Sequence, residues 1–531
     1  MFNRRIAKMK IEDMTLKQKI GQMLMVGFPS KYFDEHVRKL VYEQNIGNII
    51  LFSRNVGDSH ELATLTWDIQ ENMMKSVGVP AFIAIDQEGG MVTRIFSNAT
   101  FLPGNMAIAA TGEPDNAGKV GMIMGKELKG LGINMNLAPV LDVNNNPLNP
   151  IIGVRSYGEV PKKVAELGLN YIEALQSQGV LATGKHFPGH GDTEVDSHID
   201  LPSISHPMDR LRDVELYPFK KAIDGGMDAI MTAHILFKAL ETEFPATLSY
   251  NVITKTLREE LGFEGIVITD CMEMKAISTY FGTPKAAIAA IKAGADIILV
   301  SHTLKAQVAT VNAIENAVQK GDISMDRIDE SVKRILSMKE KYCVLDDMAG
   351  TLGEKVSQEH RVVAKDISLD SITLVKDERE LLPVESNDII AISPNPVTMT
   401  GVEDNASGTP SFAQVVTQRF GGIYSVMDVE PNESYIQAIV EKSKDKELII
   451  VGTYNANLNT GQAKLVEELY SNNKDIVVVA LRNPYDISQF KYISTYVCAY
   501  EYTPLSIRSV VEVLSGAKRP VGKLPVSLEM E

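Results

Sequence analysis

Eight short apolar runs recur at intervals along the first 342 residues of this 531-residue chain. They occupy 24–27, 48–52, 81–85, 134–141, 180–183, 229–233, 265–269 and 296–300, and helical patterns such as 164–177 and 305–319 follow most of them. Alternation of strand and helix is typical of parallel βα units. Eight such units over this length favour a closed barrel over an open sheet, so we predict a (β/α)8 TIM barrel at 1–342.

The same alternation restarts near the carboxyl terminus. A charged helical pattern at 325–341 ends the first series, and we expect 343–365 to be a linker. Strand-like runs at 389–392, 448–451, 476–480 and 495–499 are then interleaved with helical patterns at 433–442, 461–471 and 504–515. This predicts a second, smaller α/β/α sandwich domain at 366–531, and an overall α/β fold class.

Charge and cysteine content narrow the class of partner. The formal net charge of −15 disfavours nucleic acid and anionic membrane, because phosphate binding needs a basic surface. A small, neutral or weakly charged substrate fits better. Cys271, Cys343 and Cys498 are odd in number and widely spaced, which suits a reducing compartment. Since no apolar run could span a bilayer and no signal region is evident, we predict a cytoplasmic protein, with the oligomeric state left open.

Polar clusters follow several of the predicted strands. Segment 185–198, KHFPGHGDTEVDSH, holds three acids, three histidines and a lysine directly after an apolar run, and its Pro188, Gly189 and Gly191 exclude a helix. IDQEGG follows the third strand, TAH ends the sixth and TDCMEM follows the seventh. In a barrel these ends share one rim, where active sites lie. We therefore predict an enzyme whose site is at this rim.

Three groups in these clusters have the chemistry of catalysis or binding. Asp270 ends the apolar run GIVITD and should emerge rigidly at the rim, although it could instead cap a helix at MEMKAIS. Asp196 and His198 alternate in an extended loop, and such a pair suits acid/base work or a structural role. Lys185 and His186 could donate hydrogen bonds to substrate hydroxyls, whereas a solvated lysine is the alternative.

The same segment contains side chains of metal-ligand type, namely His186, His190, Asp192, Asp196 and His198. An HxxxH spacing binds metal when it lies on a helix, and Pro188 with Gly189 excludes a helix between these histidines. We therefore predict no metal and no cofactor, and expect His190 and Asp192 to bond backbone groups of a glycine-rich turn. A metal-dependent hydrolase is the alternative from another class.

Four motifs together resemble the family 3 glycoside hydrolases: IDQEGGMVTR, NNNPLNPIIGVRSYG, KHFPGHGDTEVDSH and VITDCMEM. Within that family they are most similar to the β-N-acetylglucosaminidases of bacterial cell-wall recycling (NagZ type). The resemblance covers the whole predicted barrel. The later GKLPVSL resembles the end of the α/β sandwich domain that many members append.

The resemblance implies residue roles. Asp270 is implied as the nucleophile that forms a glycosyl-enzyme intermediate, and His198 as the general acid/base with Asp196 as its partner. The family's sugar-binding positions match Asp86, Arg94, Arg155, Lys185 and His186. Two positions depart mildly from the family pattern: Cys271 stands where many members have a second Asp, and Gln87 where His is frequent.

The implied activity is retaining, exo-acting removal of terminal N-acetylglucosamine from peptidoglycan-derived disaccharides or muropeptides. A histidine acid/base is neutral after it has given up its proton, so phosphate could replace water and a phosphorylase is admissible. A β-glucosidase of the same family is a further rival, although those usually take their acid/base from a Glu in the later domain. A sugar-binding protein without catalysis is disfavoured by the intact Asp270, Asp196 and His198.

Overall fold

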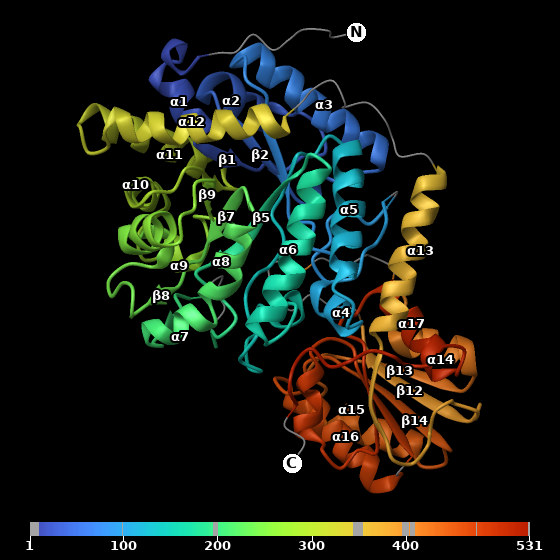
Figure 1. Cartoon of the computed structure of the whole chain (residues 1–531). Helices are drawn as coiled ribbons and strands as arrows, with labels where there is room; N and C mark the ends of the chain where they lie inside the picture. The colour runs from blue at the N-terminus through green and yellow to red at the C-terminus, as the bar shows by residue number, and fades with distance from the viewer. Residues whose placement is uncertain are drawn as a thin grey trace.

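The computed structural model describes residues 10–97, 99–194, 200–343, 354–395, 403, 409–473 and 475–528. The chain forms two domains, a larger barrel and a smaller sheet domain beside it (Figure 1). Among the described residues, no helix combines the length and the apolar character needed to cross a membrane.

The first domain is a parallel barrel of eight strands in the order β10-β1-β2-β3-β4-β5-β7-β9. A bridge between Ile268 and Ile297 brings the two ends of this sheet together. The TIM-barrel prediction is thus confirmed, with each predicted strand present. Their bounds are β1 (Leu24–Val26), β2 (Asn48–Leu51), β3 (Phe82–Ile85), β4 (Met135–Asn136), β5 (Leu181–Phe187), β7 (Ala229–Thr232), β9 (Ile266–Thr269) and β10 (Ile298–Val300).

Amphipathic helices surround the strands (Figure 1). In α3, for example, Asp58 caps the first turn in a reciprocal pair with Glu61, and the face bearing Leu62, Leu65 and Ile69 is buried. The barrel helices are α1 (Leu16–Gln22), α2 (Glu35–Gln44), α3 (Ser59–Ser76), α4 (Asn105–Ala110), α5 (Asp115–Gly130), α6 (Pro161–Ser177), α7 (Met208–Asp213), α8 (Leu216–Asp224), α9 (Lys275–Ser278), α10 (Thr283–Ala293), α11 (Leu304–Gln319) and α12 (Met325–Tyr342).

Among the barrel strands, β5 and β4 differ most in length from their predicted ranges. β5 extends to Phe187, so Lys185 and His186 lie inside the strand and not in the loop after it. The extension arises because the backbone beyond β4 continues to pair with it: the Leu141 amide donates to the Lys185 carbonyl at 2.7 Å. Conversely, β4 covers two residues of the predicted 134–141. Pro139, which has no N–H to donate, interrupts the regular ladder.

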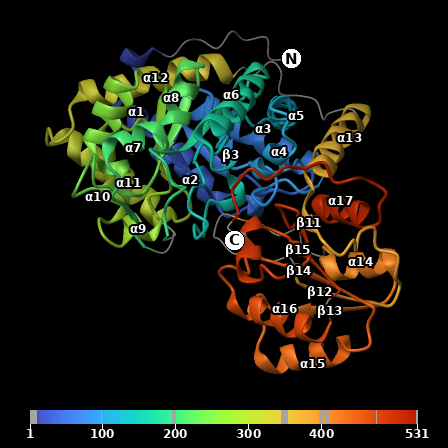
Figure 2. The same ribbon diagram turned by 60° about the horizontal axis from the view of Figure 1, so that its bottom comes forward.

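The second domain is a six-stranded sheet in the order β11-β16-β15-β14-β12-β13. β11 is antiparallel to β16, and the other pairings are parallel. α14 and α17 cover one face while α15 and α16 cover the other (Figure 2). The bounds are β11 (Thr373–Asp377), β12 (Ile389–Pro394), β13 (Ile423–Met427), β14 (Leu448–Thr453), β15 (Ile476–Ala480), β16 (Thr495–Cys498), α14 (Phe412–Phe420), α15 (Glu433–Ser443), α16 (Thr460–Asn472) and α17 (Pro504–Leu514). This confirms the predicted sandwich.

A helix that the sequence did not predict lies between the two domains (Figure 1). This helix, α13 (Glu354–Ser371), takes in the second half of the expected linker. Its Ala364 and Ile367 belong to the buried core of the barrel. On the other side, the hydroxyl of Ser368 lies 2.8 Å from that of Ser509 on α17. The helix therefore packs on both domains.

Candidate active site

A cavity of about 320 Å³ opens at the carboxyl ends of the barrel strands. Six of the residues predicted from the sequence line it: Asp86, Arg94, Arg155, Lys185, His186 and Asp270. The other two, Asp196 and His198, fall outside the described residues. The barrel thus gathers side chains from positions 86 to 270 around a single cavity.

Asp270 follows β9, whose four residues are all buried. Its amide donates to the Thr232 carbonyl of β7 at 3.3 Å, and its Oδ1 accepts from the Cys271 amide at 2.7 Å. The next helix, α9, has Met274 at its N-cap, so Asp270 is not a helix cap. A carboxylate held by the sheet at the cavity wall has the fixed position that a nucleophile requires.

Two acids and three bases form a charged cluster at the cavity wall, and all of them except Glu88 line the cavity. The Nζ of Lys185 lies 2.8 Å from Oδ1 of Asp86 and 2.7 Å from Oε1 of Glu88. Arg155 binds Glu88 with two parallel hydrogen bonds, of 2.9 Å from Nε and 2.8 Å from a terminal nitrogen. A terminal nitrogen of Arg94 lies 3.9 Å from Oδ2 of Asp86. Glu88 was not among the predicted site residues, and it connects two of them.

Charge neutralisation fixes the protonation states in this cluster. Burial by itself raises the pKa of Glu88, but Arg155 and Lys185 outweigh it and hold that pKa well below its usual range. Burial likewise lowers the pKa of Lys185, and Asp86 with Glu88 more than compensates and raises it. Near neutral pH Glu88 is therefore an anion that cannot act as general acid. The cluster presents fixed donors and acceptors, which suits recognition of sugar hydroxyls.

A second unpredicted acid, Asp142, orients His186. Its fully buried carboxylate accepts from the amides of His186 at 3.1 Å and His190 at 2.7 Å, and its Oδ2 lies 2.7 Å from Nδ1 of His186. Burial raises the pKa of Asp142, but His186 outweighs this and lowers it. Because a carboxylate accepts, Nδ1 of His186 carries the proton and the tautomer is fixed. The sequence signal that could have identified Asp142 is its position as a polar residue directly after the predicted strand at 134–141.

His190 completes this wall of the cavity. Its ring lies edge-on to that of His186, with centroids 5.6 Å apart, and its Nδ1 lies 2.9 Å from Oγ1 of Thr193. Burial, with His186 beside it, lowers the pKa of His190 to about 4, so the ring is neutral at physiological pH. The His190 carbonyl accepts from the side chain of Asn149, and the contact of its ring with the Thr193 hydroxyl was not predicted.

Two further features of the lining were not predicted. Arg54 stacks 4.2 Å from the centre of the Phe52 ring and donates to the Ser301 carbonyl at 3.0 Å. Cys271, at the position where many family members have an Asp, lies 2.8 Å from the Ser301 hydroxyl. Burial raises the pKa of the Cys271 thiol to about 11, so this position is uncharged.

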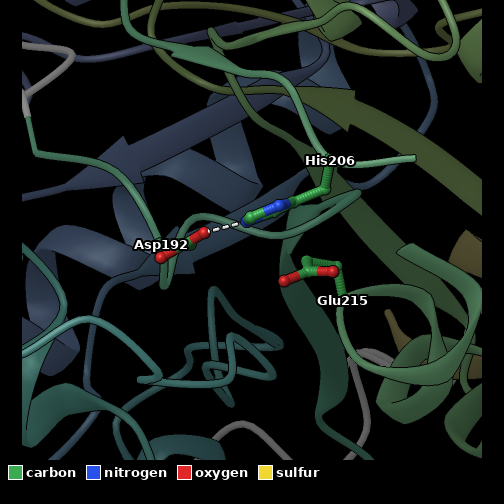
Figure 3. Close-up of side chains that lie close together, drawn as sticks. All are labelled: Asp192, His206 and Glu215. Carbon is green, nitrogen blue, oxygen red and sulfur yellow. Dashed lines mark hydrogen bonds and ion pairs between the residues drawn. The ribbon is translucent and has the colours of Figure 1, made fainter. Parts of the chain in front are cut away.

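Beside the cavity, Asp192 meets His206 and Glu215 (Figure 3). Asp192 is in direct contact with Nε2 of His206, a partner that the sequence did not predict. Ligand-type atoms of all three side chains lie within 4.8 Å of one another. Glu215, however, accepts two hydrogen bonds of 2.9 Å from Arg210. A dication here would have to displace a guanidinium.

We expect prolonged dialysis against EDTA to leave turnover unchanged, with no stimulation when Zn²⁺, Mg²⁺ or Mn²⁺ is added back. The reason is that the cavity carboxylates near Lys185 already have cationic partners, and His186 is held by Asp142. The measurement is the steady-state rate before and after chelation, with metal content determined on the same samples. Loss of activity that stoichiometric zinc restores would establish the metal-hydrolase alternative.

Comparison with known proteins identifies the chain as a glycoside hydrolase. The model of the glycosyl hydrolase family 3 N-terminal domain matches residues 15–338, and that of the family's C-terminal domain matches residues 372–531. The chain therefore belongs to glycosyl hydrolase family 3, as the four sequence motifs indicated.

Individual relatives agree with this assignment. A solved family 3 β-N-acetylglucosaminidase from Paenibacillus sp. str. FPU-7 superposes with a TM-score of 0.91 at 40% identity, covering 98% of this chain and 100% of that one. Beta-hexosaminidase A of Pseudoalteromonas piscicida is 37% identical over 70% of this chain and 69% of its own length. A beta-hexosaminidase of Tolumonas auensis is 33% identical over 55% of this chain and 86% of its own length.

Proposed function

We propose that this chain is a retaining exo-β-N-acetylglucosaminidase. Its substrates in this proposal are small cytoplasmic fragments of peptidoglycan that end in N-acetylglucosamine. The observation that carries this proposal is a single cavity lined both by Asp270, which is fixed in position after β9, and by the cluster of Asp86, Lys185 and Arg155. The named activity of the Paenibacillus and Pseudoalteromonas relatives supports β-N-acetylhexosaminidase chemistry.

In the proposed reaction the Asp270 carboxylate attacks the anomeric carbon. A carbon–oxygen bond forms to Asp270 as the bond to the leaving group breaks, and His198 gives its proton to the departing oxygen. The neutral imidazole then takes a proton from water, which displaces Asp270. Two inversions restore the original anomeric configuration. Asp196 orients the imidazole and stabilises its charged form.

The charged cluster binds the sugar in this scheme. Asp86 accepts hydrogen bonds from hydroxyls, while Lys185, Arg94 and Arg155 donate, and His186 offers its free ring edge in a fixed tautomer. Glu88 takes no part in proton transfer, because its two cationic partners keep it ionised. Its role is to hold Arg155 and Lys185 in place.

A phosphorylase is the second candidate. After proton donation a histidine is neutral and does not repel an incoming anion, unlike a glutamate. Phosphate could then replace water in the second step and release N-acetylglucosamine 1-phosphate.

The deciding experiment compares nitrophenyl β-glycosides of N-acetylglucosamine and of glucose, each with and without phosphate. The proposal expects strong preference for the acetamido sugar, free N-acetylglucosamine as the sugar product, and retention of configuration by NMR. Muropeptide-derived disaccharides should be cleaved in preference to diacetylchitobiose. Equal rates on the glucoside contradict the proposed specificity, and a sugar phosphate as the main product identifies a phosphorylase.

A further inference from the structure

The carboxyl-terminal edge of the second domain's parallel strands contacts the barrel. In open α/β sheets this edge is the usual place for a bound ligand. Here the connections that follow β15 and β16 instead hold backbone of the barrel, through Asn483 and Glu501. Both side chains are almost completely buried. Figure 2 shows the second domain lying against the barrel.

Asn483 holds the turn that carries Arg155. Its Oδ1 accepts from the amide of Val154 at 3.2 Å, and Val154 directly precedes Arg155. The first residue of this turn, Gly153, has a φ of +45°, and a Cβ there would lie 2.4 Å from Oδ1 of Asn483. The contact is therefore so close that only glycine fits.

Glu501 holds the ends of the loop that carries Arg94. Its Oε2 accepts from the Gly104 amide at 3.0 Å, and a Cβ on Gly90 would lie 2.3 Å from that oxygen. The Gly90 amide donates to the Leu102 carbonyl at 2.8 Å, which draws the two ends of the loop together. This loop follows β3 along the chain, and Asp86 and Glu88 lie between the end of the strand and Gly90.

The two contacts converge on the charged cluster. Asn105, next to the Gly104 amide, donates from its side chain to the Arg155 carbonyl at 2.7 Å. Glu88, Arg155 and Glu501 also line a common cavity of about 10 Å³, room for roughly one water molecule. Among the described residues no second-domain side chain lines the large cavity. The second domain thus contacts the backbone that supports the sugar-binding groups.

We propose that Asn483 and Glu501 are positioning residues through which the second domain sets the affinity of the barrel for its sugar. This rests on the proposed function in that Asp86, Arg94 and Arg155 bind the substrate. Neither residue touches Asp270, so the chemical step is not their target. Loss of either contact loosens the groups that bind the sugar, which weakens binding of the ground state and of the transition state equally. KM therefore rises and kcat stays unchanged.

The test uses the full chain with Asn483→Ala and Glu501→Ala. Each is expected to raise KM on the order of 10-fold, with kcat within about twofold of wild type, and to weaken N-acetylglucosamine binding by a similar factor in calorimetry. Glu501→Gln retains an oxygen that can accept from Gly104 and should restore KM. Any β-glycoside that the wild type cleaves can be the substrate for this test, because the result is the ratio of variant KM to wild-type KM. The proposed function is tested separately, by which substrates the wild type prefers.

Asn457→Ala is the matched control. Its side chain also crosses the domain boundary, donating to the Pro147 carbonyl at 3.1 Å, but it contacts neither of the two supporting segments. We expect unchanged KM in this variant. If an alanine variant fails to fold, Asn483→Ser or Glu501→Ser replaces it, and the same rise in KM is expected because the shorter side chain does not reach the barrel amide. Unchanged KM and sugar affinity in the folded alanine or serine variants, a fall in kcat alone, or an equal rise in KM for Asn457→Ala overturns the proposal.

Discussion

Replacing Asp270 with asparagine is expected to lower kcat on the order of 10,000-fold, the scale seen when one member of a covalent catalytic unit is removed. Asparagine is nearly isosteric, and its side-chain oxygen can still accept from the Cys271 amide, but it is a far weaker nucleophile. Fold and melting temperature should therefore be retained. Steady-state rates and a thermal melt on the same preparation measure both quantities.

Asp224→Asn supplies the control for Asp270→Asn, since Asp224 is exposed and pairs with Lys220 on the barrel surface. A slow substrate with a fluorinated sugar ring should label the wild type at Asp270, as mass spectrometry of peptic fragments can establish. Azide should not rescue the retaining reaction of the variant, although it can give an inverted product with an activated substrate. Near-wild-type activity of Asp270→Asn, or a label on another carboxylate, refutes the nucleophile assignment.

His198→Ala should damage catalysis according to the leaving group. Proton donation matters most when the leaving oxygen is basic, and general acid catalysis typically contributes ~100-fold to ~10,000-fold. Cleavage of a natural disaccharide should fall by that factor, whereas a nitrophenolate departs with little help. Asp196→Ala should show a weaker form of the same pattern, because the imidazole remains. The measurement is the ratio of aryl-glycoside to disaccharide kcat/KM in each variant.

His186→Ala distinguishes the proposed dyad from the Asp142–His186 pair that the cavity contains. If His186 binds sugar, its loss should slow both substrate classes by the same factor. A selective loss of disaccharide cleavage in His186→Ala, with an unchanged substrate ratio in His198→Ala, assigns the acid/base role to Asp142 and His186. Glu88 is a poor substitute for either histidine, because Arg155 and Lys185 keep its pKa far below neutral.

The barrel could be predicted because its strands are buried on both faces and therefore read as apolar runs, as in β9. The edge strands β11 and β13 escaped prediction because their residues are partly exposed and mixed in character. β5 was predicted too short, since Lys185 and His186 look like loop residues. They are tolerated inside a strand because Asp86, Glu88 and Asp142 neutralise or bond them.

The candidate site could be predicted where side chains follow strands, as for Asp86 and Asp270. Glu88 and Asp142 could not be given roles from the sequence, since their partners lie 67 and 44 positions away and only the fold brings them together. The roles of Asn483 and Glu501 were still harder to predict from the sequence. Their effect depends on contact between domains, and nothing in their local sequence marks it.

Helix α13 has a consequence for how the protein unfolds. Its His360 lies 2.8 Å from Glu127 of α5 in the barrel, while Ser368 meets Ser509 of the second domain. A helix packed in the barrel core and against α17 cannot leave either domain without exposing buried surface to water, and that penalty couples the melting of the two. We therefore expect the two domains to melt in a single cooperative transition. A barrel truncated within α13 would lose stability as well as its partner.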